Sequence, residues 1–266
     1  MQQIRNLFLL ALAVLPGPAV LLAQGTLTPA GALPHFATGG GWKTVWFFVN
    51  SSNNPNAAVQ LNFIVDPNNP RSIPPLANAI TGEALPAELT YSTTIAPFGL
   101  VAIESTSTDS TATTGWVQVS TDSSTTQVLE SFDYTSLPTN GIVNLQRGGA
   151  LPQYNATATG YMLPFDEVGK DYTAIAIANV TDSTINVAIT TRNYLGATKA
   201  THTLSLTPQQ HTAFLLASSY PETEGVLGTI EFYTGTPNQI AVMGLSFNGT
   251  NDAFTSELAI PTTGVQ

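Results

Sequence analysis

The sequence predicts an all-β protein made of two tandem immunoglobulin-like β-sandwich domains after a signal peptide. Three observations support this fold class: short runs in which apolar and polar residues alternate, turn-forming residues between those runs, and an internal repeat. Alternation is typical of a half-buried strand, because successive side chains of a strand point to opposite faces of the sheet. Many short strands separated by turns are typical of sandwiches and barrels.

The first element is an export signal. Arg5 is followed by an apolar run over residues 7–15, and small Ala23 precedes a polar residue. This order is typical of a secretory signal peptide, so we expect cleavage after Ala23 and a secreted, extracellular or periplasmic product. A retained membrane anchor is the alternative, but Pro16 and Gly17 interrupt the run before the ~20 residues that a spanning helix needs. We expect no membrane span in the mature chain.

The strands follow the signal. Thr, Val, Ile and aromatic residues fill the alternating runs, as β-structure favours. Clusters of Pro, Gly, Asn and Asp, such as residues 66–70 and 234–238, separate them. The clearest alternating runs are residues 59–63, 117–119, 185–190 and 203–206.

An internal repeat predicts two copies of one sandwich. Matched positions keep their order along the chain, and their separation falls from 129 to 113 residues because the first copy has an insertion near residues 71–89. Each copy has about 115 residues, close to the usual size of a two-sheet sandwich. The matches are Asn50 with Asn179, Val59 with Val187, Gly115 with Gly228, and Val128, Phe132 and Tyr134 with Ala241, Leu245 and Phe247.

The repeat also sets the expected boundaries. They are residues 1–23 for the signal peptide, 24–32 for an N-terminal linker, 33–148 for the first domain, 149–160 for a linker and 161–264 for the second domain.

One strand of the second copy carries an unusual face of small residues. Ala174, Ala176 and Ala178 alternate with Ile175 and Ile177. Small side chains permit the close approach of another layer, so this face packs either against the other domain or under loops of its own domain.

Composition excludes several functions. The chain has no cysteine, so disulfide scaffolds, Cys-ligated metals and thiol catalysis are excluded. Only 9% of residues are charged, and 7 basic against 17 acidic residues give a net charge of −10. So few scattered cations do not neutralise a phosphate backbone, so we expect no nucleic-acid partner.

A family resemblance extends over most of the mature chain. The segments that carry it are residues 35–44 running into Val49 and Asn50, then residues 163–166, 176–180, 228–232 and 242–247. Together they resemble secreted acidobacterial-type tandem β-sandwich proteins of uncharacterised function. The resemblance implies an extracellular bacterial protein and carries no catalytic residues.

Aromatic residues of the first copy suggest one binding hypothesis. Trp42 and Trp116 have no aromatic counterpart in the second copy, so they are candidates for a carbohydrate platform. A purely structural role in an aromatic core is the alternative. Trp46 alternates with core positions and aligns with Ile175, so we expect it to be buried.

Carboxylates suggest two further candidates. Asp166, Glu167 and Asp171 share one loop and are candidate calcium ligands, although no calcium-loop signature is present and no cofactor is required. Glu130 lies on an apolar face and aligns with Met243. There its pKa would be raised, as in a general acid, unless a bulge or edge position leaves it in water. His35, His202 and His211 have no local partner at metal-ligand spacing.

We therefore expect a secreted, non-catalytic structural or interaction module, whose partner is an extracellular protein or polysaccharide. The alternatives are a carbohydrate-binding protein using Trp42 and Trp116, and a carboxylate-based hydrolase using Glu130.

Overall fold

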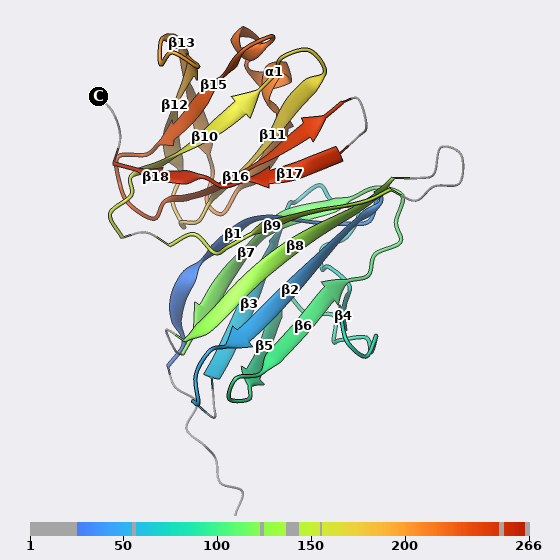
Figure 1. Ribbon diagram of the computed structural model, residues 1–266. Coiled ribbons are helices and arrows are strands. Elements are labelled where there is room, and N and C mark those ends of the chain that lie inside the picture. Colours follow the sequence, from blue (N-terminus) through green and yellow to red (C-terminus); the bar gives the residue numbers. More distant parts are fainter. Residues whose placement is uncertain are drawn as a thin grey trace, which may run out of the picture.

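The computed structural model describes residues 26–54, 57–122, 125–136, 144–154, 156–249 and 253–263, and the predicted signal peptide and its cleavage site lie outside them. Four antiparallel sheets form two sandwich-like units, β1–β9 and β10–β18, which Figure 1 shows one above the other. This confirms the all-β prediction. None of the described helices is long and apolar enough to cross a membrane.

The first unit contains nine strands in two sheets, with the orders β1-β7-β3-β5 and β4-β6-β2-β8-β9. The short strand β4 lies within the predicted insertion and extends the second sheet at its edge. The strands are β1 (Thr28–Thr38), β2 (Trp42–Asn50), β3 (Ala57–Val65), β4 (Leu76–Asn78), β5 (Thr90–Ile95), β6 (Leu100–Ser105), β7 (Thr113–Thr121), β8 (Thr126–Ser136) and β9 (Asn144–Ala150).

The second unit repeats this arrangement in the sheets β13-β12-β15-β10-β18 and β14-β11-β16-β17. A short helix, α1 (Leu216–Ser219), and a 3₁₀ turn, η2 (Pro221–Thr223), follow β14. The strands are β10 (Gly160–Asp166), β11 (Asp171–Asn179), β12 (Ile185–Asn193), β13 (Thr198–Leu206), β14 (His211–Leu215), β15 (Leu227–Tyr233), β16 (Ile240–Asn248), β17 (Ala253–Glu257) and β18 (Ile260–Thr262).

Buried asparagines show that the two units share one local structure. The Asn50 side-chain amide donates to the carbonyls of Asn54, Ile95 and Ala96. Asn179 donates in the same way to the carbonyls of Ser183, Leu206 and Thr207. Each asparagine ends an inner strand of its sheet, so the predicted pairing of Asn50 with Asn179 is also a structural equivalence.

The register corrects the predicted alignment of β8 with β16 by one residue. Trp46 pairs with Glu130 in the first unit, and its equivalent Ile175 pairs with Gly244 in the second. Glu130 therefore corresponds to Gly244 and not to Met243. A slip of one residue moves every side chain of a strand to the other face, so the correction decides which residues of β16 face the core.

Each unit has its own apolar core, and the first core continues into the second unit. Trp46 is fully buried, with its ring centroid 5.1 Å from that of Phe63 and 6.2 Å from that of Phe36. The second core is built around Ile175, Ile177, Val187, Ile189, Phe232 and Val242. Met243 and Leu245 of β16 instead belong to the first cluster, so they pack across the junction between the units.

Gly115 and Gly228 occupy equivalent positions, at which the backbone of the neighbouring strand comes very close. A Cβ atom on Gly115 would lie 2.1 Å from the Ile64 carbonyl oxygen, and one on Gly228 would lie 1.9 Å from the Arg192 carbonyl oxygen.

We expect Gly115→Ala and Gly228→Ala each to lower the free energy of unfolding by about 1–3 kcal/mol or more, because a backbone oxygen must move. Urea denaturation measures the loss. Gly149→Ala is the matched strand control, because its Cβ would lie 3.0 Å from the nearest atom. Equal losses of stability at all three positions would show that the close backbone oxygen is not the cause.

Candidate functional site

The junction between the two units brings together most of the chemically distinctive side chains. The outer face of β11 and β16 lies against β1 of the first unit, and β17 lies against β9 (Figure 1). Ala176 and Met243 are 6% and 4% exposed there, and Ala178 is fully buried. The small side chains of β11 therefore permit the close approach of the first unit, which decides between the two explanations left open by the sequence.

Trp116 seals one side of the junction. Its side chain is 2% exposed, and its indole Nε1–H donates to the carbonyl oxygen of Gln209 in the second unit at 2.9 Å. Nearby, Gln153 forms two hydrogen bonds with the backbone of Val242: its amide Nε2 donates to the carbonyl oxygen, and its Oε1 accepts from the backbone N–H at 2.8 Å. Directional bonds therefore fasten the two units in addition to apolar packing.

A chain of three polar side chains crosses the junction. His35 lies within β1, and its Nδ1 is 3.0 Å from Nε2 of His211 at the start of β14. The Nδ1 atom of His211 is 2.9 Å from an Asp66 carboxylate oxygen, which also accepts from the Thr114 hydroxyl at 2.7 Å. The Asp66 carboxylate makes Nδ1 the donor of His211, so a neutral His211 uses Nε2 to accept from His35.

Burial makes His35 a very weak base. The pKa of His35 is lowered from 6.5 to about 3, mainly by burial and also by the neighbouring His211, while Asp66 acts in the opposite direction. For Asp66, burial raises the pKa, but hydrogen bonds from His211 and Thr114 outweigh burial and the net pKa is lowered. At neutral pH Asp66 is therefore ionised, and His35, on the other side of His211, is neutral.

A cavity of about 220 Å³ lies beside His35. It is lined mainly by apolar side chains from both units, including Trp42, Met243, Leu245 and Phe247. A neutral imidazole in an apolar cavity can exchange a hydrogen bond with a polar group, but its low pKa makes it unsuited to act as a general base near pH 7.

The two candidate tryptophans differ in burial and in contacts. Trp42 is half-buried, with its ring centroid 4.5 Å from that of Tyr134 and 5.6 Å from that of Phe254 in the second unit. Trp116 is buried and bonded to Gln209. Neither ring is presented as part of a shared open platform.

Glu130 is buried in the first core and not at a wet edge. It is 3% exposed, and its Oε1 accepts from the Trp46 indole N–H at 2.7 Å. Its Oε2 is buried and has no partner among the described residues. Burial raises the pKa of Glu130 well above 4.5, although the Trp46 hydrogen bond lowers it. Glu130 does not line the cavities described between the units.

The three candidate calcium ligands mainly organise their own loop. The Glu167 Oε1 atom accepts from the Thr173 backbone N–H at 2.8 Å, and the Asp166 Oδ1 atom accepts from the Val168 N–H at 2.9 Å. The Asp171 N–H donates to the Val168 carbonyl. Burial raises the pKa of Glu167. Among the described residues, no group of three or more acidic or histidine side chains is placed to hold a metal ion.

Sequence reasoning missed the contact between His35, His211 and Asp66. These residues are 31 to 176 positions apart, so no local spacing connects them. The only available signal was the small-residue face of β11, which predicts a junction but does not show which polar residues meet there.

Trp116→Phe tests whether the junction depends on the indole bond. Phenylalanine keeps most of the apolar area but leaves the Gln209 carbonyl without its donor. We expect a loss of about 1–3 kcal/mol in the free energy of unfolding, measured in urea. Trp42→Phe is the matched control, because its indole N–H has no hydrogen bond to the described residues, and its loss should be smaller. Equal losses would show that ring area and not the hydrogen bond is decisive.

No protein-family model, no curated protein and no solved structure matches this chain.

Proposed function

We propose that this chain is an exported, non-catalytic structural or interaction module. The observation that carries the proposal is that the chemically distinctive side chains hold the two units together. His35, His211, Asp66 and Trp116 all form hydrogen bonds across the junction. Groups that are committed to each other in this way hold two sandwiches as one rigid body. A rigid body that presents its sheet faces to the surroundings suits a spacer or a docking element.

The outer faces support a contact function. The exposed face of β12 and β13 carries small or polar side chains, including Asn186, Ala188, Thr201 and Thr203. Short side chains leave few protrusions on this face, so it suits contact with another surface. The export pattern and the resemblance to secreted acidobacterial-type tandem sandwich proteins support an extracellular, bacterial setting.

We propose further that each unit is related to the immunoglobulin fold. The inner pairs β2–β6 and β3–β7 correspond to the B–E and C–F pairs of that fold. The outer strands differ, because β1 pairs with β7 and β8 pairs with β2, whereas strands A and G of the immunoglobulin fold lie in the opposite sheets. We therefore propose an immunoglobulin-like arrangement with exchanged outer strands for the two units.

N-terminal sequencing and cell fractionation of the producing organism test export. We expect the chain outside the cytoplasm, beginning at or near Gln24. Purified labelled protein added to cells that lack it tests the module function, and we expect saturable retention on the cell surface or its matrix. An intact Met1 in exported material would contradict processing, and unsaturable or absent retention would contradict a docking role.

A groove beside Trp116 keeps carbohydrate binding as the second candidate. Tyr154 is 58% exposed there, and Gln118 and Asn238 also line the groove, whose volume is about 220 Å³. An exposed aromatic ring with neighbouring amides is suited to stacking on a sugar. A glycan array separates the candidates: binding that Tyr154→Ala abolishes would establish the second, and an array without specific binding would support the first.

A further inference from the structure

The first unit carries an open apolar sheet face, which we call the open face. It is the outer surface of β6, β2 and β8, and none of the described elements lies over it (Figure 1). Leu100 and Leu129 are 51% and 40% exposed, and Phe47 between them is half-buried. The members of the open face that remain at least partly exposed are Phe47, Val49, Leu100 and Leu129, while Val45 and Ala102 on the same side of the sheet are buried between their neighbours.

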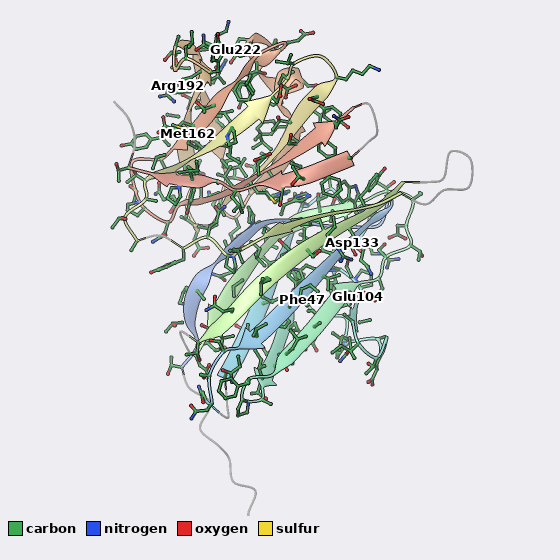
Figure 2. All side chains as sticks on the ribbon, in the orientation of Figure 1. Phe47, Glu104, Asp133, Met162, Arg192 and Glu222 are labelled. Carbon is green, nitrogen blue, oxygen red and sulfur yellow. The ribbon has the colours of Figure 1, made fainter. Side chains whose placement is uncertain are left out.

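The charges around the open face are balanced. The Lys43 Nζ atom is 3.0 Å from a Glu104 carboxylate oxygen, and the Arg147 Nε atom is 2.7 Å from an Asp133 oxygen. Figure 2 shows Glu104 and Asp133 on the same front sheet as Phe47. The chain as a whole has a net charge of −10, which opposes the approach of a second copy. These two ion pairs make this part of the surface locally neutral, so the opposition from net charge is reduced here.

The equivalent face of the second unit is the one that packs on the first unit. Because Asn50 corresponds to Asn179 and Trp46 to Ile175, Phe47 corresponds to Ala176. By the same register Leu129 corresponds to Met243. Ala176 and Met243 are 6% and 4% exposed, because β1 of the first unit covers them. One face of the repeat is thus buried by a neighbouring sandwich in the second unit and left open in the first.

In the first unit, the surface that covers β11 and β16 is the edge formed by β1. The second unit has an equivalent edge, formed by β10 and β18. In the first unit, Ala32 of β1 bridges Gln153, and this pair contacts the second unit. In the second unit, Met162 of β10 pairs with Ile260 of β18 at the equivalent place. Ile260 is 59% exposed and the nearby Leu258 is 65% exposed. We call Met162, Leu258 and Ile260 the tail edge.

We propose that the open face of one copy docks on the tail edge of a second copy, so that the chain assembles head to tail. The inference deepens the proposed module function, on which it rests, by naming a second copy of the chain as the partner. The junction inside the chain joins a sheet face to a strand edge, and these are different surfaces. An interface of that kind is heterologous and extends into an open filament unless the rotation closes a ring. Exposed apolar patches of this kind are typical of association sites.

Sedimentation velocity over a dilution series tests the assembly, using the purified chain without residues 1–23. We expect the mean mass to rise with concentration beyond that of a dimer. Leu129→Lys and Leu100→Lys on the open face, and Ile260→Lys on the tail edge, should each weaken association by about tenfold or more. Thr94→Lys is the matched control, because Thr94 is exposed on β5 in the opposite sheet of the same unit. Thermal unfolding shows that each variant is folded.

A mixing experiment identifies the geometry. Leu129→Lys leaves the tail edge intact and Ile260→Lys leaves the open face intact, so an equal mixture should form one-to-one dimers and nothing larger. A monomeric wild-type chain at all concentrations would overturn the proposal, as would equal effects of Leu129→Lys and Thr94→Lys. Loss of association by Leu129→Lys but not by Ile260→Lys would also overturn it, because it would indicate a face-to-face dimer. Export and cell retention are measured separately, so a failed module function is distinguishable from a failed assembly.

Discussion

Trp46→Ala should lower the free energy of unfolding by about 3–5 kcal/mol, the usual range for emptying a buried aromatic site. Trp46 is fully buried and packs in the core between the two sheets of the first unit. The cavity that the substitution leaves therefore has little room to collapse. The substitution also removes the one hydrogen bond that the Glu130 carboxyl group makes to the described residues. We therefore expect the loss, measured by urea denaturation, to lie at the upper end of this range.

A double-mutant cycle separates the hydrogen bond from the packing. Trp46→Phe removes the indole N–H while keeping much of the ring, and Glu130→Leu removes the buried carboxyl group. Trp46→Phe should cost clearly less in the Glu130→Leu background than in the wild type, because no polar atom is then left unpaired. The same cost in both backgrounds would show that the bond between Trp46 and Glu130 contributes nothing to stability.

The pH dependence of Glu130 gives the same pair an independent readout. Its pKa is raised in the folded state, so the unfolded chain releases this proton first as the pH rises. The contribution of Glu130 to stability is therefore full below about pH 4.5 and is lost as the pH rises towards the folded pKa. Glu130→Gln removes this loss, so its stability relative to the wild type should increase between pH 4.5 and neutral pH.

Acid should weaken the junction through His35, which is the second large effect. The pKa of His35 is about 3 in the folded protein and 6.5 for an ordinary histidine. Between these values the unfolded chain binds a proton that the folded chain does not. Stability is therefore full above about pH 6.5 and falls as the pH decreases towards 3, by up to about 5 kcal/mol at 1.36 kcal/mol per pH unit.

His35→Gln tests this source of acid sensitivity. Glutamine keeps a polar group next to His211 but has no proton to gain, so the stability of the variant should depend less steeply on pH between 6.5 and 4. Asp66 acts in the same direction at lower pH, because its folded pKa is lowered and its contribution is lost on protonation. His202→Gln is the control, because His202 lies on β13 and bonds Glu222 away from the junction. Equal slopes for the wild type and His35→Gln would contradict the role of His35.

Much of the fold could be predicted because it is written in local patterns. Period-two alternation predicted strands such as β12, and turn residues predicted their ends. Matched positions such as Asn50 and Asn179 predicted the repeat, because a buried amide that ends an inner strand must meet the same carbonyls in each copy. The alignment of Glu130 failed by one residue, because both faces of β8 and β16 carry apolar side chains and periodicity alone does not set the register.

The candidate site was much less predictable. The lack of aromatic counterparts in the second copy made Trp42 and Trp116 binding candidates. Both rings instead contact the second unit, so the difference between the copies reflects the junction. Glu130 was identified as unusual, but only the packing of Trp46 against it showed that the carboxyl group is buried and bonded.

The sequence by itself determined the all-β class and the two sandwich units, because side-chain alternation and turn chemistry act over a few residues. Only the tertiary structure decided which sheet face is covered and which is open, and which histidine meets which carboxylate. His35, His211 and Asp66 come together through the docking of whole sheets. That docking depends on the summed shape of many side chains, so no short segment of the sequence contains it.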